Sequence, residues 1–254
     1  MTENSKLSYI DTGKGNKTLL FIHGFCGSHE YWKNIIAELK DKYRVVAIDL
    51  RGHGASEEIG ASFSIDDMAA DIASFMEEQG IGKAYMFGHS LGGYITLAFA
   101  ERFPGKLSGF SLIHSTALPD DEAGKEGRLK SVGKIEMDGI IPFIDGLVPK
   151  LFANSDDPNI EHTKEIGYKT SEGGAIGSLH AMRNRTDRNH VLKETELPVL
   201  LVAGEKDKVI PAEKTFSVKG SHINEVILEG SGHMGMLEAP SRLAEEIIRY
   251  VEKN

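Results

Sequence analysis

Short apolar runs alternate with stretches of helical spacing along most of the chain. Runs of this kind that end in glycine-rich polar turns are typical of strands buried on both faces of a parallel sheet. Helical spacing predicts helices over 31–40, 65–79 and 91–102, and an amphipathic helix over 240–252. The predicted strands are 18–23, 43–49, 83–89, 109–114, 198–203 and 225–228. Strands that alternate with helices imply a parallel sheet wound by right-handed crossovers.

The pattern changes after the strand at 109–114. No strand is predicted between residues 119 and 191, where Gly, Pro and Asp separate helical fragments at 128–137, 143–151, 161–168 and 176–184. We therefore expect an α/β core domain formed by 1–117 and 192–254, with a helical cap inserted at 118–191. The acidic residues of the cap favour neutral over strongly anionic substrates.

The charge balance restricts the possible partners. The 254 residues include 29 Lys and Arg against 38 Asp and Glu, a formal net charge of −9. Nucleic acids and anionic membranes both require clustered Lys and Arg, so neither is expected as a partner. We expect a small-molecule substrate and a monomer or homodimer.

The amino terminus and the absence of long apolar stretches predict a cytoplasmic protein, and the cysteine content adds no information on the compartment. Residues 1–10 include Glu3 and Asn4 and lack the apolar region of a secretion signal, and no long uncharged apolar stretch occurs elsewhere. Cys26 is the single cysteine, which rules out an intrachain disulfide. The histidines have no metal-ligand spacing, so we expect no metal site.

Gly88-His89-Ser90-Leu91-Gly92 matches the pattern G-x-S-x-G between a predicted strand and a predicted helix. A serine at such a sharp turn has its hydroxyl exposed at the carboxyl end of the sheet, and the helix that follows directs backbone N–H groups at a developing oxyanion. Ser90 is therefore a candidate nucleophile. The alternative is a serine that only caps the helix beginning at Leu91.

A serine nucleophile needs a base and an orienting carboxylate. Asp207 follows the strand at 198–203, and His233 follows the strand at 225–228, so both lie where open α/β sheets bind ligands. The chain order Ser90, Asp207, His233 is the order of the triad in α/β-hydrolases.

These segments together resemble the α/β-hydrolase fold superfamily over almost the whole chain. Little sequence precedes residues 7–11, so we expect the first strand common in that family to be absent, leaving a mostly parallel sheet of about seven strands with the cap inserted after the sixth family strand. The matching segments are His23 to Phe25, Asp49 to Ser56, Gly88 to Gly93, Gly204 to Pro211 and Gly232-His233.

The resemblance implies a role for each site residue. Ser90 would be the nucleophile, His233 the general base and then acid, and Asp207 the residue that orients the imidazole. The backbone N–H groups of Phe25 and Leu91 would form the oxyanion hole. No cofactor is implied.

Other residues leave alternatives open. Glu205, or Asp120 or Asp121, could replace Asp207 as the acid, and His23 and His53 are expected to position backbone rather than transfer protons. Cys26, His114 and Met234 are candidates for the substrate pocket; ordinary core is the commoner role for Cys26 and Met234, and a structural hydrogen-bonding role is the alternative for His114. The charged run from Lys125 to Lys134 is interpreted as the solvated face of a cap helix.

The favoured function is a serine hydrolase that cleaves a small carboxylic ester or related acyl compound through an acyl-enzyme. A carbon–carbon bond hydrolase or a lactonase with the same triad is an alternative, since fold and triad do not fix the acyl group. A ligand-binding signalling protein with an intact but slow triad is an alternative of another class. Serine at the nucleophile position argues against dehalogenase or epoxide-hydrolase chemistry.

Overall fold

The computed structural model describes residues 6–58 and 62–254; Glu3 and Asn4, on which the prediction of localisation partly rests, lie outside these ranges. A seven-stranded sheet has the order β1-β3-β2-β4-β5-β6-β7, and only β1 runs antiparallel to its neighbour. The predicted mostly parallel sheet of about seven strands is confirmed. The strands are β1 Tyr9–Asp11, β2 Thr18–Ile22, β3 Arg44–Ile48, β4 Ala84–His89, β5 Leu107–Ile113, β6 Val199–Gly204 and β7 Ile223–Leu228.

The four central strands explain the unbroken apolar runs of the sequence. Helices cover both faces of β2, β4, β5 and β6, so almost every side chain on these strands is buried. β7 differs from the prediction, because it is an edge strand and only Leu228 is fully buried on it. The prediction of a fully buried strand there was wrong.

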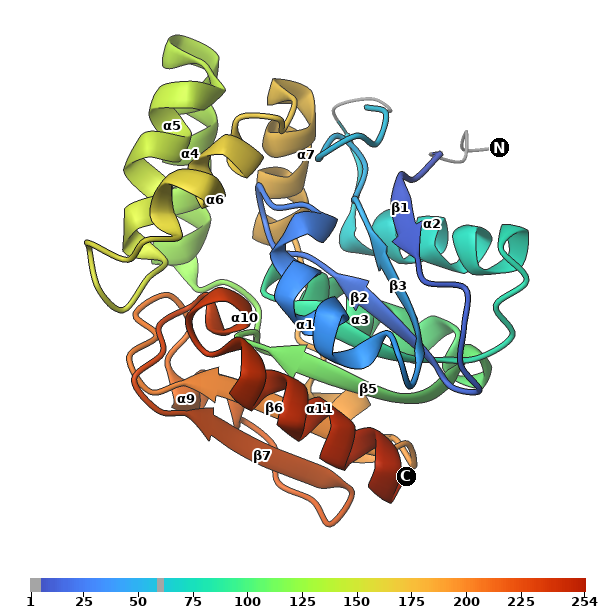
Figure 1. Cartoon of the computed structure of the whole chain (residues 1–254). Helices are drawn as coiled ribbons and strands as arrows, with labels where there is room; N and C mark the ends of the chain where they lie inside the picture. The colour runs from blue at the N-terminus through green and yellow to red at the C-terminus, as the bar shows by residue number, and fades with distance from the viewer. Residues whose placement is uncertain (1–5, 59–61) are drawn as a thin grey trace.

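Two groups of helices sandwich the sheet. In Figure 1, α1 and α11 lie in front of the strands, and α2 and α3 lie behind them. Ser64 caps α2 in a capping box with Asp67. The helices are a 3-10 turn at His29–Trp32, α1 Lys33–Leu39, α2 Ile65–Glu78, α3 Leu91–Arg102, α9 Ala212–Thr215, α10 Gly235–Glu238 and α11 Pro240–Lys253.

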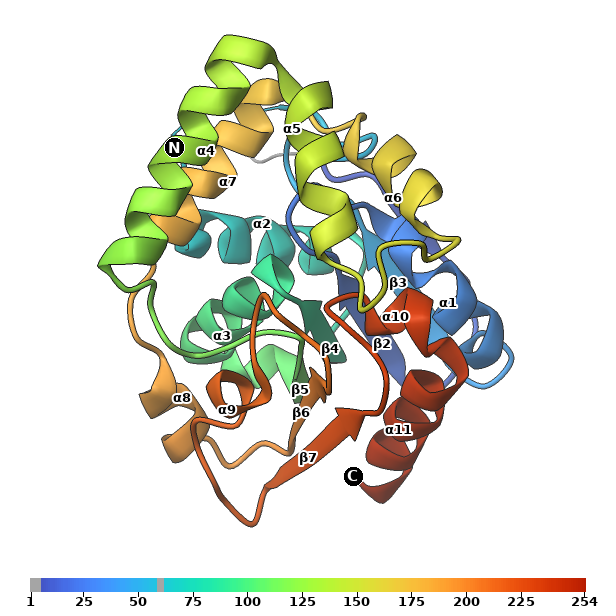
Figure 2. The same ribbon diagram turned by 90° about the vertical axis from the view of Figure 1, so that its left-hand side faces the viewer.

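Five more helices connect β5 to β6, and α4 to α7 lie beyond the carboxyl ends of the strands (Figure 2). Each of the four predicted fragments overlaps one of these helices, although α4 begins six residues earlier than predicted because Asp121 caps it. The expected boundary between residues 191 and 192 falls inside α8, which packs on α3. The helices are α4 Glu122–Asp138, α5 Ile140–Leu147, α6 Ile160–Gly167, α7 Glu172–Arg183 and α8 Asn189–Glu194.

Among the described residues, no helix combines the length and the apolar character that crossing a membrane requires.

Candidate active site

Ser90 lies on the sharp turn between β4 and α3. Its φ of 49° and ψ of −112° are strained for a residue with a side chain. The flanking glycines permit the turn, because a Cβ on Gly88 would lie 2.3 Å from the carbonyl oxygen of Gly92, and a Cβ on Gly92 would lie 2.4 Å from the carbonyl oxygen of Ile22. The Ser90 side chain makes no capping hydrogen bond to α3, so the helix-cap alternative is not what the geometry shows.

Asp207 and His233 are paired behind this turn. His233 Nδ1 lies 2.8 Å from Asp207 Oδ2, and the other carboxylate oxygen accepts hydrogen bonds from the backbone N–H groups of Val209 and Ile210 at 2.8 and 2.9 Å. Burial alone would raise the pKa of Asp207, but the charge of His233 and the hydrogen bonds from the histidines hold it well below its ordinary value. An ionised Asp207 fixes the proton on His233 Nδ1 and leaves Nε2 as an acceptor.

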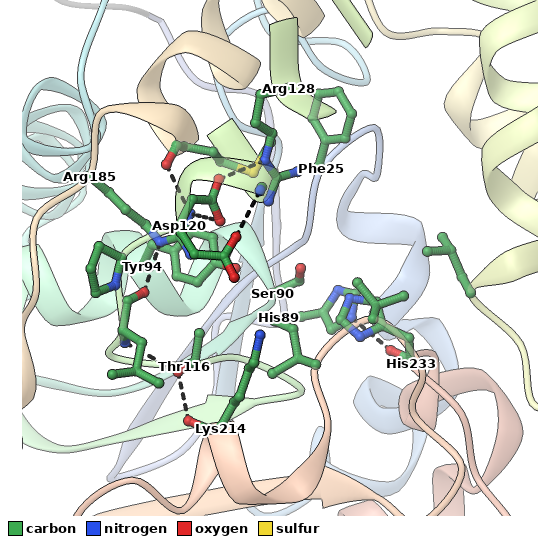
Figure 3. A pocket seen from close by; sticks show the side chains of 18 of the residues that line it. Phe25, His89, Ser90, Tyr94, Thr116, Asp120, Arg128, Arg185, Lys214 and His233 are labelled. Atoms are coloured by element: carbon green, nitrogen blue, oxygen red, sulfur yellow. Dashed lines mark hydrogen bonds and ion pairs between the residues drawn. The ribbon is translucent and has the colours of Figure 1, made fainter. Parts of the chain in front are cut away.

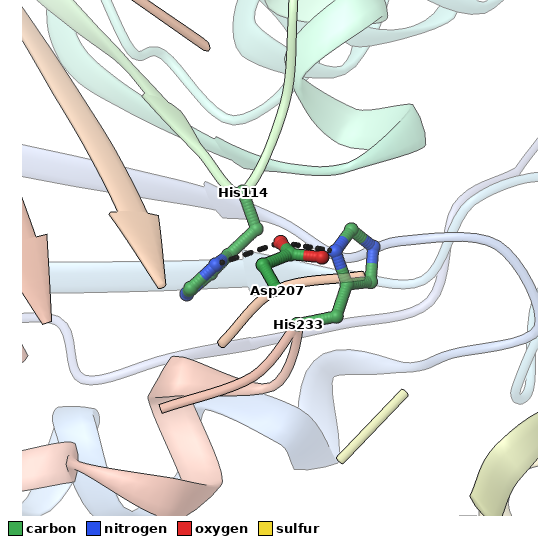
Figure 4. A group of neighbouring side chains, drawn as sticks. All are labelled: His114, Asp207 and His233. Atoms are coloured by element: carbon green, nitrogen blue, oxygen red, sulfur yellow. Dashed lines mark hydrogen bonds and ion pairs between the residues drawn. The ribbon is translucent and has the colours of Figure 1, made fainter. Parts of the chain in front are cut away.

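A second histidine contacts the same carboxylate oxygen (Figure 4). His114 Nδ1 lies 3.3 Å from Asp207 Oδ2, and His114 Nε2 accepts a hydrogen bond from the backbone N–H of Gly235 at 3.2 Å. Because Nε2 is an acceptor, Nδ1 carries the proton and donates it to Asp207. His114, Asp207 and His233 each offer one metal-ligand atom within 4.8 Å of the others. Here both histidines instead turn Nδ1 towards the carboxylate, as in a hydrogen-bonded network.

The turn after β2, where the oxyanion loop is expected, lies beside the Ser90 turn. Gly27 N–H donates to the carbonyl oxygen of Gly24 at 3.1 Å, and a Cβ on Gly24 would lie 2.5 Å from His89 Nδ1. Neither the Phe25 nor the Leu91 backbone N–H donates a hydrogen bond to any described residue. Phe25 lines the cavity described below, whereas Leu91 is buried and is not among its lining residues.

Backbone strain is concentrated around this site. Among the described residues, the non-glycine residues with positive φ are Cys26, Ser90 and His114, which follow β2, β4 and β5. Strained backbone of this kind is common at active sites, where the surrounding structure holds it in place.

Buried histidines hold the surrounding loops. His23 Nδ1 donates to the carbonyl oxygen of Gly24 at 2.7 Å and its Nε2 accepts from Leu50 N–H at 2.9 Å, while His53 Nδ1 donates to the carbonyl oxygen of Arg51. Burial lowers the pKa of His23 and lowers that of His53 to about 4, so both rings are neutral. The prediction that they position backbone is confirmed.

The loop that carries His233 is fixed on two sides. Glu238 accepts hydrogen bonds from the N–H groups of Gly232 and Met234 at 2.9 and 3.0 Å with one oxygen, and from Ala153 N–H at 2.8 Å with the other. His233 N–H itself donates to the carbonyl oxygen of Leu151 at 2.7 Å. The histidine loop is thus bound to the segment between α5 and α6.

A cavity of about 630 Å³ opens in front of Ser90 and His233 (Figure 3). Its apolar wall includes Phe25, Leu147, Leu151, Met182, Ile210 and Met234. Six charged side chains also line it, three acidic and three basic: Asp120, Asp121, Asp187, Arg128, Arg185 and Lys214. No hydrogen bond joins the Ser90 hydroxyl to His233 in the part of the chain that the structure describes.

Two of the three predicted pocket residues do not line this cavity. Met234 does, but Cys26 is buried in the core, and His114 turns away from the cavity towards Asp207. Burial raises the pKa of the Cys26 thiol, which keeps it protonated.

The alternative acids have other partners. Asp120 pairs with Arg128 and Arg185, Asp121 caps α4, and Glu205 accepts a hydrogen bond from the backbone N–H of Gly230. Only Asp207 contacts His233 among these candidates.

Several residues near the site were not predicted. His89, at the variable position of the serine motif, donates from Nε2 to the carbonyl oxygen of His233 at 2.9 Å. Arg128 was assigned to a solvated face, yet it lines the cavity. No sequence pattern indicates Lys214 or Glu238 as site residues, because their roles depend on contacts between segments far apart in sequence.

Comparisons with known proteins agree with this architecture. Residues 17–133 match the family model described as the alpha/beta hydrolase fold. A thermophilic esterase from Thermogutta terrifontis, solved with malate bound, superposes with a TM-score of 0.93 at 28% identity, covering 98% of this chain and 94% of that one. A 2-(acetamidomethylene)succinate hydrolase from Mesorhizobium japonicum is 25% identical over 97% of this chain and 91% of its own length.

A further relative is much longer than this chain. The dihydrolipoyllysine-residue acetyltransferase component of an acetoin cleaving system from Pseudomonas putida is 27% identical over 95% of this chain, which spans 65% of that relative's length. The family-model match, the sheet order and the turn at Ser90 lead to one assignment. The chain has the α/β-hydrolase fold and resembles the hydrolases of that superfamily.

Proposed function

We propose that the protein is a serine hydrolase that cleaves a small carboxylic ester through an acyl-enzyme. One observation carries the proposal: Ser90, on its strained turn, and His233, paired through Nδ1 with Asp207, line the same cavity. The relatives named as an esterase and as a hydrolase support this class of reaction.

The hydrogen bonds assign the protons. Asp207 accepts the Nδ1 proton of His233, so Nε2 is free to take the proton of Ser90 as its hydroxyl oxygen attacks the ester carbonyl. The ionised carboxylate stabilises the imidazolium that results. His233 then protonates the leaving alcohol, and water repeats the sequence on the acyl-enzyme.

The oxyanion binds to backbone donors. The N–H groups of Phe25 and Leu91 are without partners among the described residues, and they stabilise the tetrahedral oxyanion as its charge develops. His89 helps to hold the two parts of the site together, because its ring contacts the Gly24 turn on one side and hydrogen-bonds the His233 backbone on the other.

Residues 118–191 act as a cap over the substrate in this proposal. α4, the end of α5 and the end of α7 contribute Arg128, Leu147 and Met182 to the cavity. These side chains select the acyl or alcohol group, while the core supplies the chemistry.

The test is hydrolysis of p-nitrophenyl esters from acetate to octanoate by the wild type and the Ser90→Ala variant, between pH 5 and 9. We expect Ser90→Ala to lower kcat by a factor on the order of 10⁴ or more, because the nucleophile is lost. The chain-length optimum measures the depth of the cavity. A variant that is folded by circular dichroism yet keeps most of the activity would exclude Ser90 as nucleophile.

Absence of turnover on all these esters would direct attention to the alternatives. A lactone or carbon–carbon substrate requires the same triad, so Ser90-dependent cleavage of a lactone would retain the mechanism and change the substrate. Stable acylation of Ser90 without release, detected by mass spectrometry, would favour the slow ligand-binding alternative.

A further inference from the structure

The cavity lining contains a cluster of charged side chains around Asp120. Asp120 pairs through one oxygen with Arg128 Nε at 3.1 Å and through the other with Arg185 Nη1 at 2.7 Å. Two guanidinium groups thus share one carboxylate, which leaves this cluster with an excess positive charge. Lys214, on α9, adds another positive charge to the cavity lining.

Arg185 is a fixed part of the wall. Its Nε donates to the carbonyl oxygen of Leu118 at 3.1 Å, its Nη1 donates to that of Met182 at 2.8 Å, and its guanidinium lies 4.1 Å from the centre of the Tyr94 ring. The side chain is 5% exposed. Arg185 therefore holds Asp120 in position and leaves little donor capacity of its own.

Arg128 and Lys214 have unused donors. The two terminal nitrogens of Arg128 and the Nζ of Lys214 contact no acceptor among the described residues, and Figure 3 shows the Lys214 side chain extending into the cavity from α9. Thr116 fixes the base of that side chain by donating to the carbonyl oxygen of Lys214 at 2.6 Å. Unpaired cations in a partly enclosed cavity favour an anionic ligand.

Two further acidic side chains line the cavity, but neither is paired with Arg128 or Lys214. Asp121 accepts a hydrogen bond from Gly124 N–H at 2.8 Å as the cap of α4, and Asp187 accepts one from Asn189 N–H at 2.8 Å. Both are exposed, as is Lys214, whereas Asp120, Arg128 and Arg185 are partly buried. Water and salt therefore screen Asp121 and Asp187 more than they screen the Asp120 cluster. The expectation from composition, that the acidic cap disfavours anionic substrates, does not follow from where these charges lie.

We propose that the substrate is an ester that carries a carboxylate remote from the scissile bond, and that Arg128 and Lys214 bind this carboxylate. The inference rests on the proposed ester hydrolysis. Ser90 and these two cations line one cavity of about 630 Å³, so one ligand in this cavity can contact both the nucleophile and the cationic groups. The apolar residues between them contact its methylene groups.

A matched pair of substrates tests the proposal. The p-nitrophenyl esters of hexanoic acid and of adipic acid differ only in whether the remote end is a methyl or a carboxylate group. We expect the wild type to have the higher kcat/KM for the adipate ester at low salt. Arg128→Gln and Lys214→Met should each lower the adipate-to-hexanoate ratio of kcat/KM about ten-fold, through the loss of a charge-assisted hydrogen bond.

Lys130→Gln is the control. Lys130 lies on α4 like Arg128, but it is 72% exposed and pairs with Glu126, so its replacement should leave the ratio unchanged. A ratio that is also unchanged in both Arg128→Gln and Lys214→Met would overturn the proposal, and so would a wild-type preference for the hexanoate ester. If Ser90-dependent hydrolysis of either ester is still observed, these results contradict only the carboxylate site and not the proposed ester hydrolysis.

If the wild type hydrolyses neither ester, binding of the same esters to the Ser90→Ala variant tests the carboxylate site separately from the proposed ester hydrolysis. Tighter binding of the adipate ester, weakened about ten-fold by Arg128→Gln, supports the carboxylate site even if the wild type hydrolyses neither ester. Equal binding of both esters contradicts it.

Discussion

Asp207 uses every acceptor position of its carboxylate. Oδ1 accepts two backbone N–H groups, and Oδ2 accepts the Nδ1 protons of His233 and His114. All four partners are donors, so the site has no place for a side-chain N–H group. An amide at this position must direct its NH₂ group either at the histidines or at the backbone N–H groups.

This conflict makes Asp207→Asn a sharp test at the scale of one residue. The amide favours the wrong tautomer of His233, so kcat should fall roughly 10³- to 10⁴-fold with p-nitrophenyl esters. Glu205→Gln is the matched control, because Glu205 is exposed and accepts only from Gly230 N–H among the described residues. Equal losses in both variants would contradict the assignment of Asp207.

The sequence indicated the positions of Ser90, Asp207 and His233, because all three follow strands whose carboxyl ends meet at one edge of the sheet. The second histidine at Asp207 was not recognised as its partner. His114 lies 93 residues from Asp207 in the chain, and only side-chain direction decides whether it faces the cavity or the carboxylate. Strand periodicity carries no information on that choice.

At the scale of elements, the short helix α10 fixes the histidine loop. Glu238, at its end, binds the backbone on both sides of His233 and also the backbone of Ala153. One carboxylate therefore joins three segments: the loop after β7, α10 and the chain between α5 and α6. The orientation of His233 depends on this junction, since its ring is attached to the backbone that Glu238 holds.

Glu238→Gln should disturb that junction. A glutamine has one acceptor oxygen where the carboxylate has two, so at least one of the three backbone N–H groups loses its partner. We expect a loss of stability of about 2 kcal/mol in urea unfolding and a fall in kcat of about ten-fold, with a smaller change in KM. Glu245→Gln on α11, where the side chain is 61% exposed, serves as the control. Unaltered kcat in Glu238→Gln would show that His233 is held by other contacts.

The long elements were predicted more successfully than the short ones. Fully buried strands and helices of three or more turns have a clear period, whereas α8, α9 and α10 are four to six residues long and left no pattern. The beginning of α4 was missed because Gly124 and Gly127 interrupt its helical composition. Its cap at Asp121 is recognisable only once the helix is known.

At the scale of the whole molecule, buried neutral histidines link stability to pH. Burial lowers the pKa of His23, His89 and His114, and lowers that of His53 to about 4. His29 has the opposite effect on the pH dependence of stability, because its hydrogen bond to Asp49 raises its pKa. In the unfolded chain all these rings titrate near pH 6.5, so below that pH the unfolded state binds more protons and the free energy of unfolding falls.

Each histidine with a strongly lowered pKa should cost about 2 kcal/mol of stability between pH 7 and pH 5. Urea unfolding of the wild type at several pH values measures the sum. His53→Asn, which can retain the hydrogen bond to the Arg51 carbonyl, should reduce the pH dependence by about that amount. His162→Gln, at an exposed position on α6, should leave it unchanged. An identical pH dependence in His53→Asn and the wild type would contradict the linkage.

At Gly232 the backbone of the histidine loop packs closely against the segment between α5 and α6. A Cβ there would lie 2.5 Å from the backbone nitrogen of Ala153 and 3.0 Å from the carbonyl oxygen of Leu151. Replacing residues 118–191 with the corresponding segment of a relative therefore also changes contacts of the loop that carries His233. In a chimera without residues 151–153, the His233 N–H group loses its acceptor on Leu151 and Glu238 loses its contact with Ala153. A graft intended to change specificity should therefore retain those three residues.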